Sequence, residues 1–419
     1  MLKKVIATIG SKFLMALANF AIVILTTQFL GAEGKGEVSL FVLNVTIIIL
    51  FSGFVGGPSM VFLVPRTEAL KLLIPSYLWG VLSAVLITFL LVSFQLAGNY
   101  ALHLLLIALL EAFYSANLAI ILGKEKIKTH NIISIINVFS LLMAFFIFIA
   151  LGKNEVLSYL WALYIAKGIT LILSFLGVIR YLHVATKHEF GSVFKNAFRY
   201  GFYTQVGNIA QIFNYRLSYY LLEHYWNKGL VGVYATGMHL AEVLWIVKGG
   251  ISMVQYARIA NSNDINYSKK ITLILLKISL ITTLAMLVVL LLMPTEFFTF
   301  IFGSEFTQVK KVIWYLAIGI TAFSVSGILS GYFAGNGLHH VNMTSSLIGL
   351  VFTVVLGFWL IPKYSLMGAG ITATISYSAS TLYQALIFMK ETKMNVIDFL
   401  PTKKDAERLK TELKNLCRS

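Results

Sequence analysis

The sequence predicts an all-α, polytopic membrane protein with twelve transmembrane helices in two six-helix halves. Three observations predict this class. Of the 419 residues, 58% are hydrophobic and only 12% are charged, with a mean hydropathy of +0.84, which exceeds what a soluble core can bury. Apolar runs of about 20 residues, the length of one membrane crossing, recur along the chain. Lys and Arg are also concentrated on one side of the predicted membrane.

The first half contains six apolar runs, at about 9–30, 38–63, 72–94, 101–122, 131–151 and 156–180. The first run follows a basic start and continues to Leu30 without a small-residue cleavage site. It is therefore predicted to be a membrane helix and not a removed signal peptide. The polar stretch 181–201 follows the sixth run and is predicted to be a cytoplasmic linker.

Six further runs follow at about 202–222, 230–256, 271–293, 311–334, 340–361 and 367–389. The predicted domains are an amino-terminal bundle (1–180), the linker (181–201), a carboxy-terminal bundle (202–390) and a basic amphipathic tail (391–419). In the tail, Leu409, Leu413 and Leu416 form an apolar stripe among basic residues. This pattern is typical of a helix on an anionic membrane surface, and a solvated end is the alternative.

The basic residues predict the orientation in the membrane. Of the 33 Lys and Arg, 23 fall on one side of the predicted topology and six on the other, and four fall inside helices: Lys167, Arg216, Lys248 and Lys277. The positive-inside rule then places both termini in the cytoplasm. The net charge of +16 is explained by this placement, so no nucleic-acid partner is expected.

Several chemistries are not expected from this sequence. The single cysteine, Cys417, excludes an internal disulfide and a cysteine-built zinc site. His339 and His340 are adjacent and would point apart on a helix, which argues against a metal site. The sequence has no GxxxxGK[ST] motif for ATP. We therefore expect no cofactor, no bound metal and no enzymatic activity.

The two halves resemble each other faintly in sequence. Gly36 and Gly232 each precede a small residue by three positions at the start of corresponding helices, and Gly123 and Gly335 correspond at a later hairpin. These similarities predict parallel repeats related by an axis along the membrane normal. The substrate pathway would then lie between the halves.

The helix at 202–222 carries a polar face. At 100° per residue, one narrow face holds Gln205, Asn208, Arg216, Tyr219 and Glu223. These residues are predicted to line a pathway for phosphate and sugar groups, because an arginine at membrane depth is costly as a merely structural residue. Interhelical hydrogen bonding is the alternative.

The next helix carries Glu242 and His239, one turn apart. Glu242 is a possible partner for Arg216, although it lies roughly 9 Å deeper at 1.5 Å per residue. The three residues form either a proton or ion relay or a structural ion pair, and both interpretations stay open. Lys248 is predicted to extend toward the cytoplasmic surface.

In the first half, Glu111 and Lys167 lie at similar depth and are predicted to neutralise each other. They either hold the bundle together or place charge beside the cavity. Asn19, on the first helix with Thr26, is predicted to contact sugar hydroxyls or to bridge helices. The break at Gly53–Pro58 is predicted to bend during alternating access, or to serve close packing.

Three segments resemble a known family: FNYRLSYYLLEHY, VGVYATGMHLAEVLW and FWLIPKYSLMGAGITATISYS. They are similar to the bacterial polysaccharide (O-antigen, Wzx-type) flippases of the multidrug/oligosaccharidyl-lipid/polysaccharide exporter superfamily. The resemblance implies a V-shaped exporter with a central cavity in the inner membrane. Many relatives have an acidic residue where this chain has Tyr215, so no Asp/Arg role is transferred to that position.

The implied function is to flip a lipid-linked oligosaccharide, carried on undecaprenyl diphosphate, from the inner to the outer leaflet. Membrane lipids, a polysaccharide polymerase and chain-length proteins are the partners implied. One alternative is a cation-coupled multidrug exporter, which would favour acidic sites. Another is a membrane polymerase or ligase, which would need a large outer loop that the sequence lacks.

Overall fold

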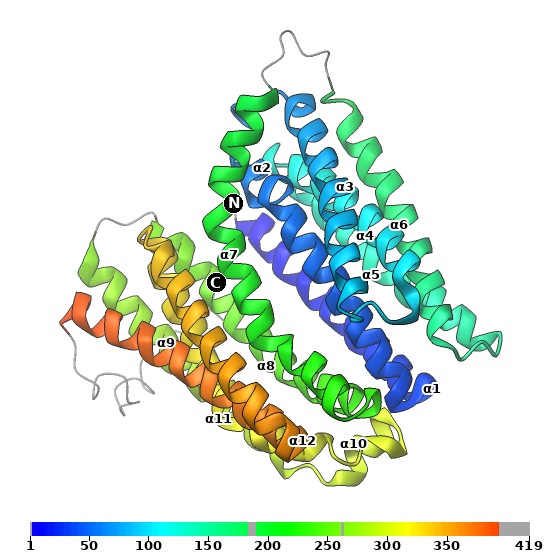
Figure 1. Cartoon of the computed structure of the whole chain (residues 1–419). Coiled ribbons are helices and arrows are strands. Elements are labelled where there is room, and N and C mark those ends of the chain that lie inside the picture. Colours follow the sequence, from blue (N-terminus) through cyan, green and yellow to red (C-terminus); the bar gives the residue numbers. More distant parts are fainter. Residues whose placement is uncertain (1, 183–189, 261–263, 394–419) are drawn as a thin grey trace. The chain divides into compact units, whose positions relative to one another are not determined.

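The computed structural model describes residues 2–182, 190–260 and 264–393, and these are almost entirely helical, with no β-strand among them (Figure 1). The long helices of the first part of the chain are α1 (Leu2–Gly56), α3 (Ala69–Ser93), α4 (Ala101–Gly123), α5 (Ile127–Ala150), α6 (Val156–Ile179) and α7 (Phe190–Tyr225). Those of the second part are α8 (Lys228–Ala260), α9 (Ile265–Leu292), α11 (Val309–Gly335) and α12 (His339–Thr392). The short elements are α2 (Pro58–Leu63), η1 (Gly98–Tyr100), α10 (Thr295–Phe302) and η2 (Ser304–Phe306).

The two longest helices each supply two membrane crossings. α1 has 55 residues and α12 has 54, so each would extend about 80 Å if straight, far more than the roughly 30 Å apolar core of a bilayer. Non-helical backbone interrupts α1 at Gly31 (φ 68°, ψ −172°) and α12 at Ser365 (φ 50°, ψ −125°). Both breaks fall between predicted apolar runs.

In the described ranges, eight helices are long and apolar enough to span a membrane, and the two double-length helices are among them. α7 and α8, with 36 and 33 residues, are also long enough to span a membrane but are not among these eight. Counting each half of the two broken helices once, and adding α7 and α8, gives twelve long helices in the described part of the chain. The predicted all-α fold and helix number are confirmed.

The predicted linker is partly helical. α7 begins at Phe190, within the predicted 181–201 segment, and Phe198 stacks on Phe54 with ring centroids 5.3 Å apart. Phe194 and Phe198 also each lie 5.7 Å from the ring of Trp79. Aromatic packing therefore fixes the start of α7 on α1 and α3. Residues 183–189 and the predicted basic tail from 394 onward lie outside the described residues.

The helices form two compact units. Unit 1 comprises Met1–His239 together with Thr295–Val309, and unit 2 comprises Leu240–Pro294 together with Lys310–Ser419. α7 and the first turns of α8 thus pack with the amino-terminal helices. The predicted six-helix bundles divide the chain by membrane crossings, whereas these units divide it by contacts between residues. The bounds of the predicted bundles therefore stay a prediction.

Buried amides and hydroxyls join helices within each unit. In unit 1, Asn117 of α4 accepts a hydrogen bond from the Tyr77 hydroxyl at 2.7 Å and donates one to Ser174 at 3.1 Å. In unit 2, Gln384 of α12 accepts from Ser326 at 2.7 Å and donates to Ser330 at 2.8 Å. Such polar contacts hold helices together in lipid, where apolar surfaces give no preference for protein over solvent.

Candidate functional site

The polar face of α7 begins with a buried amide. Gln205 is only 4% exposed, and its Nε2 donates to the carbonyl oxygen of Gly53 at 3.3 Å. A Cβ at Gly53 would lie 2.5 Å from that nitrogen, so a larger residue would displace the Gln205 amide. Gln205 is thus lodged in the end of α1 and joins two helices within unit 1.

The place where Gln205 binds is a break in the chain. Pro58 has no backbone N–H, so the carbonyl of Phe54, four residues earlier, lacks its helical donor. Gly201 of α7 lies against this carbonyl: a Cβ at Gly201 would be 2.2 Å from the Phe54 oxygen. The α7 backbone therefore packs directly on the break.

Asn208 extends the amide chain away from the buried core. Its Nδ2 donates to Oε1 of Gln205 at 3.3 Å, and the residue is half-buried. The contacts favour interhelical hydrogen bonding for Gln205, and they leave Asn208 as the more accessible amide. Its predicted contact with substrate stays a prediction.

Arg216 lies on α7 against a tyrosine one turn later. Its Nη1 donates to the Tyr219 hydroxyl, and its Cζ lies 5.0 Å from the centre of the Tyr219 ring. Tyr219 is itself 1% exposed and packs edge-on against Tyr234 at 5.9 Å. Tyr219 therefore orients the half-buried guanidinium and is itself covered in this structure; the pathway role predicted for both residues stays a prediction.

The structure brings Glu111 and Lys167 together. Lys167 Nζ lies 2.5 Å from Glu111 Oε2, and the side chains are 12% and 21% exposed respectively. The same ammonium lies 5.4 Å from the ring of Tyr114. α4 and α6 are thus joined by a partly buried ion pair that neutralises both charges; whether it also borders a cavity stays a prediction.

The remaining predicted residues lie on α1 and α8. Asn19 is exposed on α1, whereas Thr26 is fully buried and donates to carbonyls of its own helix at 2.9 and 2.8 Å. His239 and Glu242 are half-buried on α8, and each makes at least one polar or electrostatic contact. Because the boundary between the units falls after His239, the proposed relay stays a prediction.

Lys248 was predicted to extend toward the cytoplasmic surface, and that prediction is wrong. The residue is 9% exposed, and its ammonium donates to the carbonyl oxygen of Phe323 at 3.2 Å. The nitrogen also lies 3.2 Å from the centre of the Phe323 ring and 4.9 Å from that of Trp245. Side chains on a helix tilt toward its amino terminus, which directs Lys248 back along α8.

The α8–α11 seam creates the space for this lysine. Trp245, Lys248 and Ser252 each donate to a main-chain carbonyl of α11 exactly 75 residues later, at 3.4, 3.2 and 3.0 Å. A Cβ at Gly327 would lie 2.6 Å from Lys248 Cδ, so this glycine makes room for the side chain. Phe323, which holds the ammonium, lies at the middle of α11.

Among the described residues, Lys248 forms no ion pair with a carboxylate. The sequence carried a signal for this site, because Trp245 lies one turn before Lys248 and so shares its helix face. The partners on α11 are about 75 residues away, and neither spacing nor periodicity indicates them. Lys248 is therefore a candidate functional cation that sequence reasoning missed.

Unit 1 also contains a polar cavity of about 400 Å³, lined by Leu30, Glu33, Gly34, Glu37, Tyr100, Asn154, Glu155, Val156 and Leu157. Glu37 is paired with Lys228 at its edge. The described residues contain no group of three or more His, Cys, Asp or Glu arranged to hold a metal ion.

The fold matches solved transporters over nearly the whole chain. The MurJ lipid II flippase in an inward closed conformation superposes with a TM-score of 0.75 at 14% identity, covering 95% of this chain and 89% of MurJ. A multidrug resistance MATE family transporter of the MOP superfamily gives 0.71 at 16% identity, covering 90% and 94%. A MOP superfamily transporter from Pyrococcus furiosus, described as having a binding pocket of reversed polarity, gives 0.68 at 16% identity, covering 94% and 95%.

At the sequence level the likeness is shorter. The "Capsular polysaccharide biosynthesis protein CapF" of Staphylococcus aureus is 27% identical over 161 residues, which is 37% of this chain and 40% of CapF. No protein-family model matches the sequence. The chain therefore has the fold shared by the MurJ flippase and the MATE transporters, and its helices are those of a multi-pass membrane protein.

Proposed function

We propose that this protein is a flippase that moves a lipid-linked oligosaccharide from the inner to the outer leaflet of the bacterial cytoplasmic membrane. Its support is the fold shared with a lipid II flippase and the partial sequence match to a capsular polysaccharide biosynthesis protein. The fold alone leaves the charge of the substrate open, because multidrug transporters share it. The charge of the buried groups is the evidence that favours one class.

The observation that carries the proposal is the environment of Lys248. Its ammonium lies at the middle of α11, with a carbonyl and aromatic faces as partners and no ion pair with a described carboxylate. A charge at membrane depth normally marks a substrate or ion pathway. When protonated, Lys248 repels an organic cation and attracts a phosphate, so the group favours an anionic substrate.

The substrate then divides into three chemical parts. The diphosphate of an undecaprenyl carrier would contact a cation, with Arg216 and Lys248 as alternative candidates, because charged hydrogen bonds to phosphate are the strong ones. Amides such as Asn208 would contact sugar hydroxyls, while the lipid tail remains in the bilayer. Alternating exposure of the two units to each side, with both termini cytoplasmic, would complete the transfer. Polymerase and chain-length proteins are the proposed downstream partners.

The test compares an anionic and a cationic ligand on the same purified protein in lipid nanodiscs. We expect undecaprenyl diphosphate to bind the wild type roughly tenfold to hundredfold more tightly than Lys248→Gln, as expected for loss of one charge-assisted contact. Lys248→Arg keeps the charge and is the matched control, expected to retain most of the affinity. Equal binding by all three proteins would show that Lys248 does not contact the diphosphate.

Tetraphenylphosphonium, a permanent organic cation, tests the second candidate function, a multidrug exporter. The similarity to MATE transporters favours that candidate. Saturable binding of tetraphenylphosphonium to the wild type, with no binding of undecaprenyl diphosphate, would support the exporter and contradict the flippase.

A further inference from the structure

One segment belongs to a different unit from its chain neighbours. The segment Thr295–Val309, here called the strap, packs with unit 1, although Pro294 before it and Lys310 after it belong to unit 2. The strap contains α10 and η2 and lies between the predicted apolar runs 271–293 and 311–334. The chain therefore leaves unit 2, docks on unit 1 and returns.

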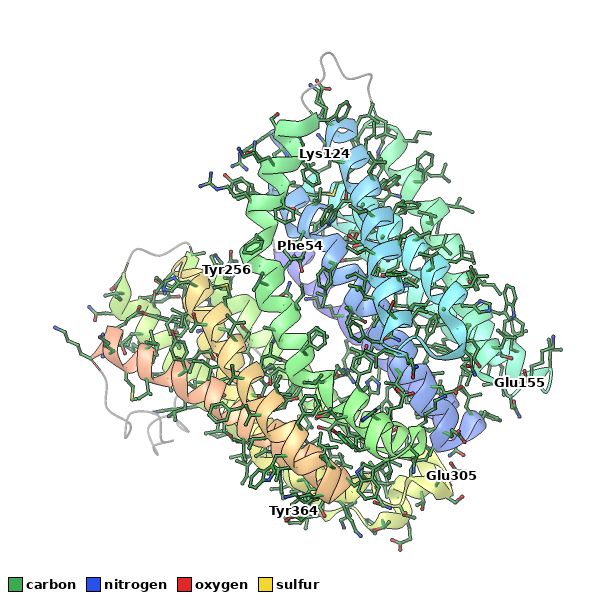
Figure 2. The ribbon with its side chains drawn as sticks, viewed as in Figure 1. Phe54, Lys124, Glu155, Tyr256, Glu305 and Tyr364 are labelled. Atoms are coloured by element: carbon green, nitrogen blue, oxygen red, sulfur yellow. The ribbon has the colours of Figure 1, made fainter. Side chains whose placement is uncertain are left out.

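The docking point is the break in α1. Gly31 has a positive φ of 68°, which separates the two halves of α1 and leaves Ala32 at the start of a new helix. The backbone N–H of Ala32 has no carbonyl partner four residues earlier in regular geometry, and it donates to Oε2 of Glu305 at 2.6 Å (Figure 2). A carboxylate at a helix amino terminus is also favoured by the helix dipole.

The reciprocal contact caps the strap's own helix. Gln28 of α1 donates through Nε2 to the carbonyl oxygens of Phe300 at 2.9 Å and Ile301 at 2.8 Å, near the carboxyl end of α10. These are carbonyls that a helix leaves without internal partners. The strap thus caps the helix that begins after Gly31, and Gln28 of α1 caps the carboxyl end of α10.

Buried aromatic side chains anchor the same segment. Phe298, Phe302 and Phe306 are at most 1% exposed, and the ring of Phe302 packs edge-on against Phe20 of α1 with centroids 6.2 Å apart. Undocking would expose large apolar rings and remove the two caps. The strap is therefore docked on α1 by buried rings as well as by hydrogen bonds.

We propose that the strap is a fixed part of unit 1 and moves with it, so that movement of unit 2 during transport is absorbed at the two junctions, after Pro294 and before Lys310. Glu305, through its contact with Ala32, is the positioning residue that keeps it docked, together with the buried aromatic rings of the strap. The transport part of this inference rests on the proposed flippase function. The docking part does not.

The experiment uses a short, reducible bifunctional thiol reagent on the full chain in membranes. Cys417 is the single native cysteine, so Cys417→Ser gives a cysteine-free background. Gln28→Cys with Ile301→Cys places one thiol on α1 and one on the strap. A permanently docked strap predicts one fast cross-linking phase that runs to near completion; slow or incomplete reaction would overturn the proposal.

The second readout is transport after cross-linking, measured as oligosaccharide reaching the outer leaflet. A strap that stays docked predicts that the cross-linked protein keeps at least half of the activity of the reduced protein. Loss of transport that a reductant restores would show that the strap must undock. The two single-cysteine variants, treated in the same way, control for modification alone. If the cysteine-free parent moves no such lipid, the proposed function fails, and the cross-linking kinetics still decide whether the strap is docked.

Discussion

Gly36 of α1 and Gly232 of α8 lie back to back, each against the backbone of the other helix. A Cβ at Gly36 would be 1.9 Å from the carbonyl oxygen of Lys228, and a Cβ at Gly232 would be 2.0 Å from that of Ala32. Lys228 lies four residues before Gly232, and Ala32 lies four residues before Gly36. Such a reciprocal contact is expected where corresponding segments of two repeats meet on an approximate two-fold axis, and it brings together the two glycines that the sequence comparison paired.

We predict that Gly36→Ala or Gly232→Ala destabilises the protein by about 1–3 kcal/mol, because the added methyl group meets rigid backbone and the helices must separate. The measurement is the thermal unfolding midpoint of the purified protein in detergent. Each substitution should lower it.

Gly168→Ala is the matched control for this pair. It lies inside α6, and a Cβ there meets nothing within 4 Å. Alanine should be neutral or slightly stabilising at this position, since it favours a helix over glycine by up to about 1 kcal/mol. An equal midpoint for Gly36→Ala and Gly168→Ala would show that α1 and α8 do not meet at this point.

Gln205 and Gly53 should be energetically coupled. Gly53→Ala is predicted to displace the Gln205 amide and to destabilise the protein by about 1–3 kcal/mol, through overpacking and loss of a buried hydrogen bond. In a Gln205→Ala background the same change should have little effect, because the obstructing atom is absent. A double-mutant cycle on unfolding free energies measures this coupling. A coupling energy near zero would contradict the contact between the Gln205 amide of α7 and Gly53 of α1.

The Glu111–Lys167 pair should behave as a unit. Lys167→Met is predicted to cost about 3–5 kcal/mol, because it leaves a partly buried carboxylate without its counter-charge. Glu111→Gln combined with Lys167→Met should recover most of that loss, and thermal unfolding of the three variants is the measurement.

Transport by the double variant separates the two interpretations of this pair. Recovery of stability together with transport indicates a structural ion pair. Recovery of stability without transport indicates that the charges act on the pathway. If Lys167→Met alone is as stable as the wild type, the ion pair does not stabilise the fold.

The helices were predictable because membrane crossings are local in sequence. The breaks at Gly31 and Ser365 fall between apolar runs, and each run is long enough for one crossing. The strap was not predictable in the same way. Its docking depends on pairing Glu305 with a backbone N–H 273 residues earlier, and no periodic pattern encodes such a contact.

The candidate site was predictable only in part. Opposite charges at similar predicted depths were enough to pair Glu111 with Lys167. Helical periodicity placed Gln205 and Tyr219 on the polar face of α7, but it could not reveal that both are buried against other elements. Lys248 was misassigned because a lysine near the end of a membrane helix can extend in either direction. The groove that selects one direction is formed by Gly327 and Phe323, on another helix.

The central claim is tested most directly by measuring how much lipid-linked oligosaccharide reaches the outer leaflet in a strain that lacks this protein. The strain is complemented with the wild type, with Arg216→Ala or with Arg216→Lys, and the amount of folded protein in the membrane is matched. We expect oligosaccharide to accumulate in the inner leaflet without the protein and with Arg216→Ala. The wild type should restore transfer, and Arg216→Lys should restore it in part. Transfer to the outer leaflet at the normal rate in the strain without the protein would contradict the account.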